Sequence, residues 1–229
     1  MNALALDSSG ELLSVALAAG PGAWYTEIDC GMRHSELMME CVDWLCKSSS
    51  VSALELGAVA CMQGPGSFTG IRIGFSCAKG IALALGIPLA AVPTLDCLAW
   101  PHSAFPGLVL PVIDAKKGCF FSALYRKGQR LCEYMDASPE YIAKELARVK
   151  LSGAEPVMIT GCGAKALIPL LAEWMDSCYT CLDPGWRRGK ARELLEIVSQ
   201  DGFFSGICPN SGPLYLRKSD AELYYGISR

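Results

Sequence analysis

The chain has few of the side chains that build metal sites, and it has no long apolar run. Its 229 residues include only two histidines, His34 and His102, far apart in the sequence, which excludes a site built on a two-histidine motif. The longest apolar run, from Ile81 to Val92, is interrupted by Gly86 and Pro88 and is too short to cross a bilayer. We therefore expect no metal ion, no cofactor and no membrane contact.

The chain also lacks an excess of basic residues. Its net charge is −3 at pH 7, which argues against strong independent binding of nucleic acid, because such binding depends on a basic surface. We interpret the short basic cluster of Arg187, Arg188, Lys190 and Arg192 as a solvated face. Hydrophobic residues at 52% and charged residues at 19% indicate a globular protein with a large core.

No secretory signal precedes the first predicted strand, although the chain has 12 cysteines. Many of them, such as Cys41, Cys61 and Cys77, lie within apolar patterns, which is typical of small buried residues in a reducing compartment. The pair Cys178-x-x-Cys181 has no second pair at the spacing that a zinc site needs. We expect a cytoplasmic protein whose cysteines are structural.

A glycine-rich segment from Gly64 to Gly74, with the sequence GPGSFTGIRIG, is the most informative part of the chain. It joins an apolar strand to a long helix, and such a turn often binds phosphate through free N–H groups at the helix start. The spacing G-x-G-x-x-x-G is one residue too long for the dinucleotide motif, and the lysine of a P-loop is missing. The segment therefore has the form of a nucleotide site without its chemical groups.

Two segments in the two halves of the chain resemble each other. An apolar strand ends at Asp7 and another at Asp114, and each is followed by a polar turn and a second apolar strand, at Ala16-Leu17 and at Ala123-Leu124. This repeat and the alternation of strands and helices predict an α/β fold with mixed sheets in two duplicated lobes. The breaker-rich stretch 100–107 separates them, so the first lobe is predicted at 1–100 and the second at 101–208, with the segment from about 209 to 229 packing back on the first. A helix is predicted from Pro139 to Val149, and a short terminal helix after the extended segment from Pro213 to Arg217.

Two predicted helices, from His34 to Lys47 and from the glycine segment to about Leu85, are apolar nearly all round. The first has one narrow polar stripe, and the second has a stripe of small residues that permits close approach of another helix. The stripes are formed by Glu36, Glu40, Asp43 and Lys47, and by Gly70, Gly74, Ala78 and Ala82. Either the second lobe and neighbouring loops cover these helices, or the pair is an interface with another protein or a second copy.

The sequence shows no group of residues that would be expected to act together in catalysis. Asp7, followed by Ser8, has the position of a metal–phosphate ligand or a base, but turn capping explains the pair as well. Gly163 follows a strand in a position to contact a nucleotide, and a tight turn explains it equally well. His34 begins a helix and is interpreted as a cap or surface residue.

Taken together, these pieces resemble the TsaB family, also called YeaZ, over most of the chain. The glycine segment is the most specific match. The other matching pieces are weak singly, but they occur along the chain in the same order as in the family. All the matching pieces are Leu4 to Ser9, Arg33 to Leu37, Gly64 to Gly74, Lys79-Gly80, Leu83-Ala84, Ile87-Pro88, Asp114-Ala115 and Pro213 to Arg217.

The resemblance implies an actin/hsp70/sugar-kinase-like (RNase H-like) fold of two duplicated lobes and a non-catalytic role. Members of the family pair with a related catalytic subunit, TsaD, which carries a metal and transfers threonylcarbamoyl to N6 of adenosine 37 of tRNA, and the ATPase TsaE joins them. The implied partners are therefore a TsaD-like subunit, a TsaE-like ATPase and, for the chain alone, a second copy. Contact with tRNA is expected only indirectly, through the complex.

The resemblance also implies that pairing uses the two apolar helices. The residues predicted to bind the partner are Leu37, Met38, Cys41, Leu45, Gly70, Ile71, Gly74, Phe75, Ala78 and Ala82. No catalytic residue is predicted, and Asp7, Ser8 and Gly163 are assigned to a vestigial nucleotide site. The alternative hypothesis is an ATP-binding enzyme or a glycoprotease-like metallopeptidase of the same fold, which the small number of histidines disfavours.

Overall fold

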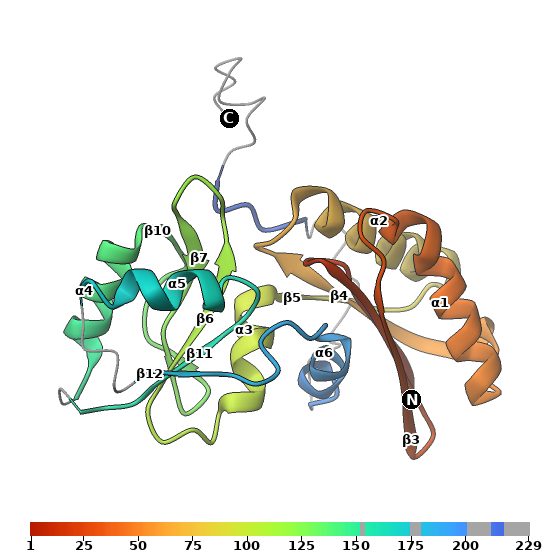
Figure 1. Cartoon of the computed structure of the whole chain (residues 1–229). Helices are drawn as coiled ribbons and strands as arrows, with labels where there is room; N and C mark the ends of the chain where they lie inside the picture. The colour runs from red at the N-terminus through yellow and green to blue at the C-terminus, as the bar shows by residue number, and fades with distance from the viewer. Residues whose placement is uncertain (152–153, 175–179, 201–211, 218–229) are drawn as a thin grey trace.

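Two α/β lobes, each built on a mixed sheet, make up the molecule and lie side by side in Figure 1. The computed structural model describes residues 1–151, 154–174, 180–200 and 212–217. The predicted fold class of two similar α/β lobes is confirmed.

The sheet of the first lobe has the strand order β3-β2-β1-β4-β5, in which β1 is antiparallel to β2 and parallel to β4. The strands are β1 (Asn2–Asp7), β2 (Leu12–Ala19), β3 (Gly22–Asp29), β4 (Leu56–Gly64) and β5 (Leu89–Pro93). The predicted first hairpin is confirmed by the pairing of Leu4 with Leu17. Strand β3 was not predicted; it lies at the sheet edge and alternates half-buried and exposed residues.

Helices α1 (His34–Ser49) and α2 (Phe68–Leu85) cover one face of this sheet (Figure 1). The Ser67 hydroxyl caps α2 by accepting a hydrogen bond from the Gly70 N–H, and Gly86 ends the helix in a left-handed conformation. By length and composition alone, α2 is apolar enough to cross a membrane. Its buried side, however, packs in the core of the first lobe, and a core helix meets the same criterion.

The sheet of the second lobe repeats the pattern of the first around a central β6. Its strands are β6 (Leu108–Asp114), β7 (Phe120–Ser122), β8 (Tyr125–Arg126), β9 (Gln129–Arg130), β10 (Met135–Ala137), β11 (Val157–Thr160) and β12 (Thr180–Leu182). As predicted, β1 ends at Asp7 and β6 at Asp114. The predicted antiparallel partner of β6 is confirmed by the pairing of Ile113 with Phe121 in β7. Ala123 and Leu124 themselves lie between β7 and β8, where the Leu124 carbonyl accepts a hydrogen bond from the Leu131 N–H.

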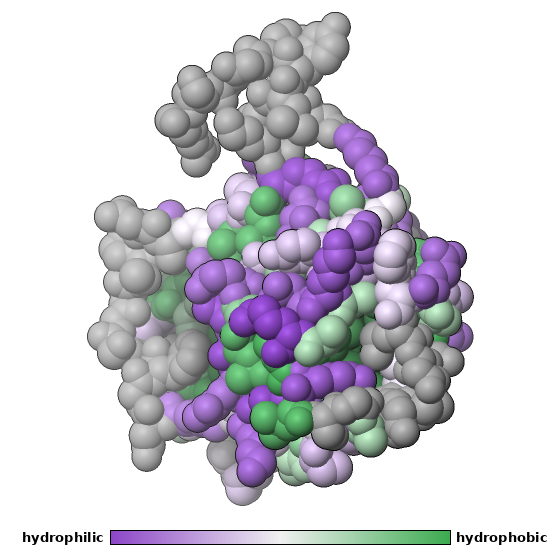
Figure 2. All heavy atoms as spheres, turned by 90° about the vertical axis from the view of Figure 1, so that its left-hand side faces the viewer, coloured by the Kyte–Doolittle hydropathy of each residue, from purple (hydrophilic) through white to green (hydrophobic). Residues whose placement is uncertain are grey.

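Helices α4 (Pro139–Val149) and α5 (Ala164–Leu171) lie in the second lobe, and α4 has the predicted bounds. Helix α4 is amphipathic: Ile142, Ala143 and Leu146 are buried, whereas Glu140 and Lys144 form an ion pair on the outside. Figure 2 shows this side of the molecule, where hydrophilic residues alternate with small hydrophobic areas. Helix α4 therefore buries one side only, as α1 and α2 of the first lobe also do.

Two further helices lie between the two sheets, and each packs on strands of the lobe to which it does not belong by sequence order (Figure 1). Helix α3 (Thr94–Ala99) follows the first sheet and packs on β6 as well as on β4 and β5, and α6 (Ala191–Val198) follows the second sheet but packs on β1, β2 and β4. The remaining turns of helix are the 3-10 segments η1 (Ala53–Glu55) and η2 (Trp100–His102). The boundaries predicted from the sequence count α6 in the second lobe, whereas its apolar side chains complete a core of the first.

Residues 212–217 are extended and run along the first lobe toward the second. The Leu214 N–H donates a hydrogen bond to the Gln63 carbonyl at 2.7 Å, and the Gln63 side chain donates one to the Gly212 carbonyl. The Arg217 guanidinium then reaches the second lobe, where it binds Asp136. We call residues 212–217 the C-terminal strap. The short terminal helix predicted after it lies outside the described residues.

The cysteines in the described part of the chain are free thiols. Cys41 and Cys61 are buried, as their apolar surroundings predicted, whereas Cys77 is only half-buried. Burial raises the pKa of the Cys61 thiol to about 12. Cys162 is exposed, so burial does not extend to every cysteine. Cys178, one half of the predicted C-x-x-C pair, lies outside the described residues.

Candidate functional site

The glycine segment lies where the two lobes meet, and its glycines make room for atoms of the chain itself. Gly64 has φ +109°, and a Cβ atom there would lie 2.6 Å from the Leu214 carbonyl oxygen of the strap. A Cβ atom at Gly70 would overlap the Ser8 carbonyl oxygen. A Cβ atom at Gly66 would lie 2.5 Å from the Ser9 carbonyl oxygen, and one at Gly74 would lie 2.5 Å from the Ser8 hydroxyl oxygen.

The start of α2 is likewise engaged by the turn that follows β1. The Ser67 N–H donates to the Ser9 carbonyl at 2.8 Å, and the Ser8 hydroxyl donates to the Gly70 carbonyl at 2.8 Å. A phosphate cradle requires backbone N–H groups that point into open space. The Ser67 and Gly70 N–H groups are instead bonded within the chain, although the start of α2 also lines an open cavity of about 730 Å³ between the lobes. The glycines therefore serve close packing between β4, α2 and the turn after β1.

Asp7, at the end of β1, has a buried carboxylate with partners on both oxygens. One oxygen accepts hydrogen bonds from the N–H and the hydroxyl of Ser9, and the other accepts one from the Lys190 N–H at 2.9 Å. Of the two roles considered from the sequence, the structure places Asp7 in turn capping, with an added tie to a loop of the second lobe. Ser8 is also buried and bonded, as described above.

Gly163, the third residue of the predicted nucleotide site, packs against β6. Its N–H donates to the Val112 carbonyl at 3.0 Å, and a Cβ atom would lie 2.8 Å from the Asp114 nitrogen. This close approach accounts for a glycine at the position. Asp7 and Ser8 are neighbours at the end of β1, whereas Gly163 belongs to the facing end of the other sheet.

A loop of residues 183–190, which we call the cleft loop, crosses from the second lobe to the first between these two sheet ends. The Gly189 N–H donates to Glu27 at 2.7 Å, and Arg187 lies 3.2 Å from both Glu11 and Asp29. Lys190 is buried beside Glu193. The interpretation of this basic cluster as a solvated face is therefore wrong for Lys190, which is buried, whereas Arg187 is exposed and pairs with the exposed Glu11 and Asp29.

Asp183 anchors the start of the cleft loop. Its carboxylate accepts hydrogen bonds from the Thr160 hydroxyl at 2.7 Å and the Gly185 N–H at 2.8 Å, and His102 lies 3.2 Å away. Burial alone would raise the pKa of this carboxyl, but the Thr160 and Gly185 bonds and His102 outweigh burial and lower it below 3.8. Asp183 was not predicted; an acidic residue directly after a short strand was the signal.

His34 is buried at the start of α1, with 7% of its surface exposed, and the interpretation as a surface residue is wrong. Its Nε2 atom has no hydrogen-bond partner among the described residues. In the same part of the chain, no group of three His, Cys, Asp or Glu side chains is arranged to hold a metal ion.

The residues predicted to bind a partner lie on the inner side of the helix pair. Leu37 is half-buried, and the other nine are buried in the first lobe: Met38, Cys41, Leu45, Gly70, Ile71, Gly74, Phe75, Ala78 and Ala82. A surface that binds another chain must be accessible in the unbound protein, so these residues are wrong as direct contacts. The small-residue stripe is covered partly by Ser8 of the same chain, as the first of the two interpretations stated.

The outer side of the helix pair carries a different set of apolar residues. They are Met39 and Trp44 on α1 and Phe68 and Leu83 on α2. Met39 lies three positions after Glu36 and Trp44 four after Glu40, so helical spacing places them on the face of the polar stripe. An apolar residue within that polar stripe was the signal that the sequence analysis missed.

A family model described as "TsaD: tRNA N6-adenosine threonylcarbamoyltransferase" matches residues 29–165. The chain is 30% identical over 162 residues to "tRNA threonylcarbamoyladenosine biosynthesis protein TsaB" of Bacillus subtilis, which covers 70% of this chain and 71% of the relative. It is 35% identical over 133 residues to the protein of the same name from Escherichia coli, covering 56% and 57%.

Solved structures are similar over nearly the whole chain. A Pseudomonas aeruginosa protein described as having similarity to peptidase YEAZ superposes with a TM-score of 0.79 at 27% identity, covering 94% of this chain and 99% of that one. A second structure, "YeaZ from Pseudomonas aeruginosa", has a TM-score of 0.77 at 25% identity and the same coverage.

Proposed function

The chain belongs to the TsaB family, and on that basis we propose that it is a non-catalytic subunit in the biosynthesis of N6-threonylcarbamoyladenosine in tRNA. In this proposal it pairs with a TsaD-like catalytic subunit, a TsaE-like ATPase joins the pair, and tRNA is contacted only through the complex. The chain alone forms a homodimer. The proposed location is the cytoplasm, where tRNA is modified.

The observation that carries the non-catalytic role is the occupation of the predicted nucleotide site by the chain itself. Both oxygens of Asp7 have backbone or side-chain partners, and the turn after β1 is hydrogen-bonded to Ser67 and Gly70 at the start of α2. The cleft loop ties the two sheet ends together through Lys190 and Gly189. A nucleotide could bind there only if these contacts broke, which supports an assembly role over turnover.

The outer side of α1 and α2 is the proposed partner surface. The exposed apolar residues Met39, Trp44 and Leu83 lie on it among charged residues of α1 such as Glu40 and Asp43. Exposed aromatic and apolar side chains surrounded by polar ones are typical of protein interfaces. The buried residues Met38, Ala78 and Ala82 support this surface from beneath by fixing the helices on the sheet.

Reconstitution tests the proposal. The purified chain, a TsaD-like subunit, a TsaE-like ATPase, tRNA and the substrates of threonylcarbamoyl transfer are combined, and the modified nucleoside is measured by mass spectrometry. We expect modification by the complete set and none by this chain alone. Transfer by the isolated chain would contradict the non-catalytic role, and full activity of the TsaD-like subunit without this chain would contradict the role as a required subunit.

Replacing Trp44 by alanine tests the proposed surface. Trp44 is 55% exposed, and Trp174, in the second lobe, is 52% exposed and gives a matched control. Because buried tryptophans dominate interface energies, we expect Trp44→Ala to weaken partner binding at least about tenfold. Trp174→Ala should leave the affinity within about twofold of wild type. Equal effects of both variants, in proteins with unchanged thermal unfolding, would place the interface elsewhere.

A further inference from the structure

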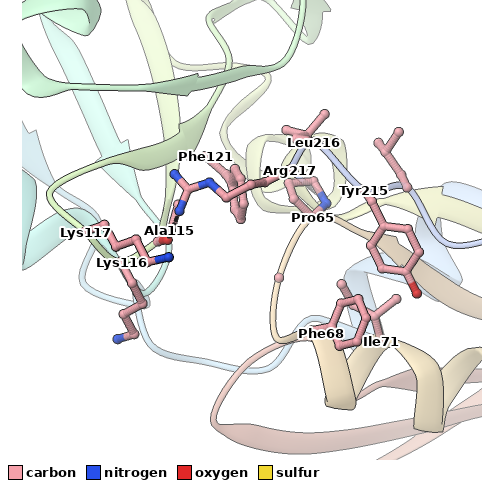
Figure 3. A pocket seen from close by; sticks show the side chains of 12 residues that line it. Pro65, Phe68, Ile71, Ala115, Lys116, Lys117, Phe121, Tyr215, Leu216 and Arg217 are labelled. Carbon is pink, nitrogen blue, oxygen red and sulfur yellow. Dashed lines mark hydrogen bonds between the residues drawn. The ribbon is translucent and has the colours of Figure 1, made fainter. Parts of the chain in front are cut away.

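A pocket of about 430 Å³ lies between the lobes beneath the C-terminal strap (Figure 3). Its volume is in the range of pockets that bind small ligands, roughly 300–1,000 Å³. None of Asp7, Ser8 or Gly163 lines it. The described residues around it are Pro65, Gly66, Phe68 and Ile71 of the first lobe, Ala115, Lys116, Lys117 and Phe121 of the second, and Leu214 to Arg217 of the strap.

Three cations line the pocket, Lys116, Lys117 and Arg217, and no carboxylate is among the described lining residues. Two of these cations are paired with carboxylates just outside the lining. The Lys116 ammonium lies 2.8 Å from Asp114, and Asp136 and the Ala115 carbonyl hold Arg217, the latter at 2.8 Å. The three cations outnumber the two carboxylates, which favours an anion such as a phosphate.

The opposite side of the pocket is aromatic. Figure 3 shows Phe68 and Tyr215 across the opening from the two lysines and Arg217. The centroids of the two rings are 5.2 Å apart, and Arg72 holds both by lying 3.7 Å from the Phe68 centroid and donating to the Tyr215 hydroxyl at 2.9 Å. Phe68 and Tyr215 each remain 39% exposed, so ring surface is left for a planar ligand.

We propose that this interlobe pocket binds a nucleoside monophosphate unit, with the base against Phe68 and Tyr215 and the phosphate at Lys116, Lys117 and Arg217. The unit is either a free mononucleotide or one nucleotide of a single-stranded RNA. The juxtaposition of an aromatic wall and a cationic wall across one opening carries the proposal. The glycine segment contributes by geometry, because Gly64 gives the strap the room to form one side of the pocket.

Isothermal titration of the full chain with four probes tests both walls. The probes are AMP, adenosine, ribose 5-phosphate and a short single-stranded RNA. Since AMP can make both the stacking contact and the charge-assisted phosphate contact, it should bind at least about tenfold tighter than adenosine or ribose 5-phosphate, which each lack one of them. Binding of AMP indicates a free nucleotide as ligand, and binding of RNA alone indicates a strand. Absence of saturable binding by AMP and by RNA below about 1 mM would overturn the proposal.

Variants of matched geometry assign the binding to this pocket. Lys117 (φ 56°) and Lys127 (φ 50°) have the same left-handed backbone in exposed turns, and only Lys117 lines the pocket. Asparagine tolerates that conformation, so Lys117→Asn and Lys127→Asn both keep their turns. We expect Lys117→Asn to weaken binding about tenfold and to reduce its salt dependence, and Lys127→Asn to leave both unchanged.

Phe121→Leu tests the same pocket without a change of charge, and it should also weaken the binding. Equal affinities in Lys117→Asn, Phe121→Leu and wild type would overturn the assignment. These titrations use the chain alone, so their failure is distinguishable from failure of the reconstitution described above.

Discussion

At the scale of single residues, the glycine segment shows how a motif can keep its spacing while its atoms serve packing. Gly64 admits the strap and Gly70 admits the turn after β1, and in each case a backbone carbonyl occupies the place of a Cβ atom. The sequence analysis identified the absence of the P-loop lysine. It could not identify the carbonyls, because Ser8 and Leu214 are remote from the segment in the sequence.

Gly70→Ala tests this packing, and Gly80→Ala in the same helix is the control. The new methyl group at residue 70 would overlap the Ser8 carbonyl, whereas residue 80 has no atom within 4 Å of a Cβ position. We expect Gly70→Ala to lower the free energy of unfolding by about 1–3 kcal/mol. Gly80→Ala should raise it by up to about 1 kcal/mol, because alanine favours helix. Urea denaturation measures both, and a Gly70→Ala protein as stable as wild type would contradict the packing.

At the scale of elements, the cleft loop and the strap both make contacts that join the lobes. The cleft loop reaches Glu27 and Asp7 of the first sheet, and the strap reaches Asp136 of the second. Neither segment has apolar residues at the regular spacing of a helix or a strand, so the hydrophobic pattern of the sequence does not predict their positions. Their positions follow from hydrogen bonds to backbone and carboxylate groups rather than from burial of a face.

Asp183→Asn tests how the cleft loop is anchored. Because the folded-state pKa of Asp183 is lowered, its carboxylate stabilises the fold above the unfolded pKa, and this stabilisation is lost as the pH falls through the folded value. Urea denaturation should therefore show wild-type stability falling from pH 5 to pH 3 more steeply than that of Asp183→Asn. At pH 7 the variant should be about 1–3 kcal/mol less stable, since it loses a charged acceptor.

Asp43→Asn, at an exposed ion pair with Lys47, is the control for this series. Surface pairs contribute little, so it should change stability at pH 7 by less than about 1 kcal/mol. Parallel pH profiles of wild type and Asp183→Asn would contradict the anchoring role.

At the scale of the whole molecule, the two lobes depend on each other because α3 packs on β6 of the second sheet and α6 packs on β1, β2 and β4 of the first. The face of the first sheet opposite α1 and α2 is made of small residues such as Ala3, Ala5, Ala58 and Ala60, and Leu194 and Val198 of α6 cover it. The predicted boundary at residue 100 thus separates the first sheet from the helix that completes its core. The lobes are similar in topology, yet each is incomplete without a helix from the other half of the chain.

A fragment of residues 1–100 tests this dependence. Without α6 it exposes the alanine-rich face of the sheet, so we expect no cooperative thermal or urea unfolding by circular dichroism. Mixing it with the fragment 101–229 should restore a cooperative transition, which controls for damage caused by the cut itself. Cooperative unfolding of fragment 1–100 alone, near the midpoint of the full chain, would show that the first lobe is an independent domain.

Local patterns in the sequence determined the strands around Asp7 and Asp114, helices α1, α2 and α4, and the family, because periodicity, caps and a long motif depend on residues close together. Tertiary structure alone decided which atoms occupy the glycine segment, which face of α1 and α2 remains exposed, and which helix covers which sheet. Those outcomes depend on contacts such as that between Asp7 and Lys190, 183 positions apart. No local pattern encodes such contacts, because they form only when distant segments of the chain pack together.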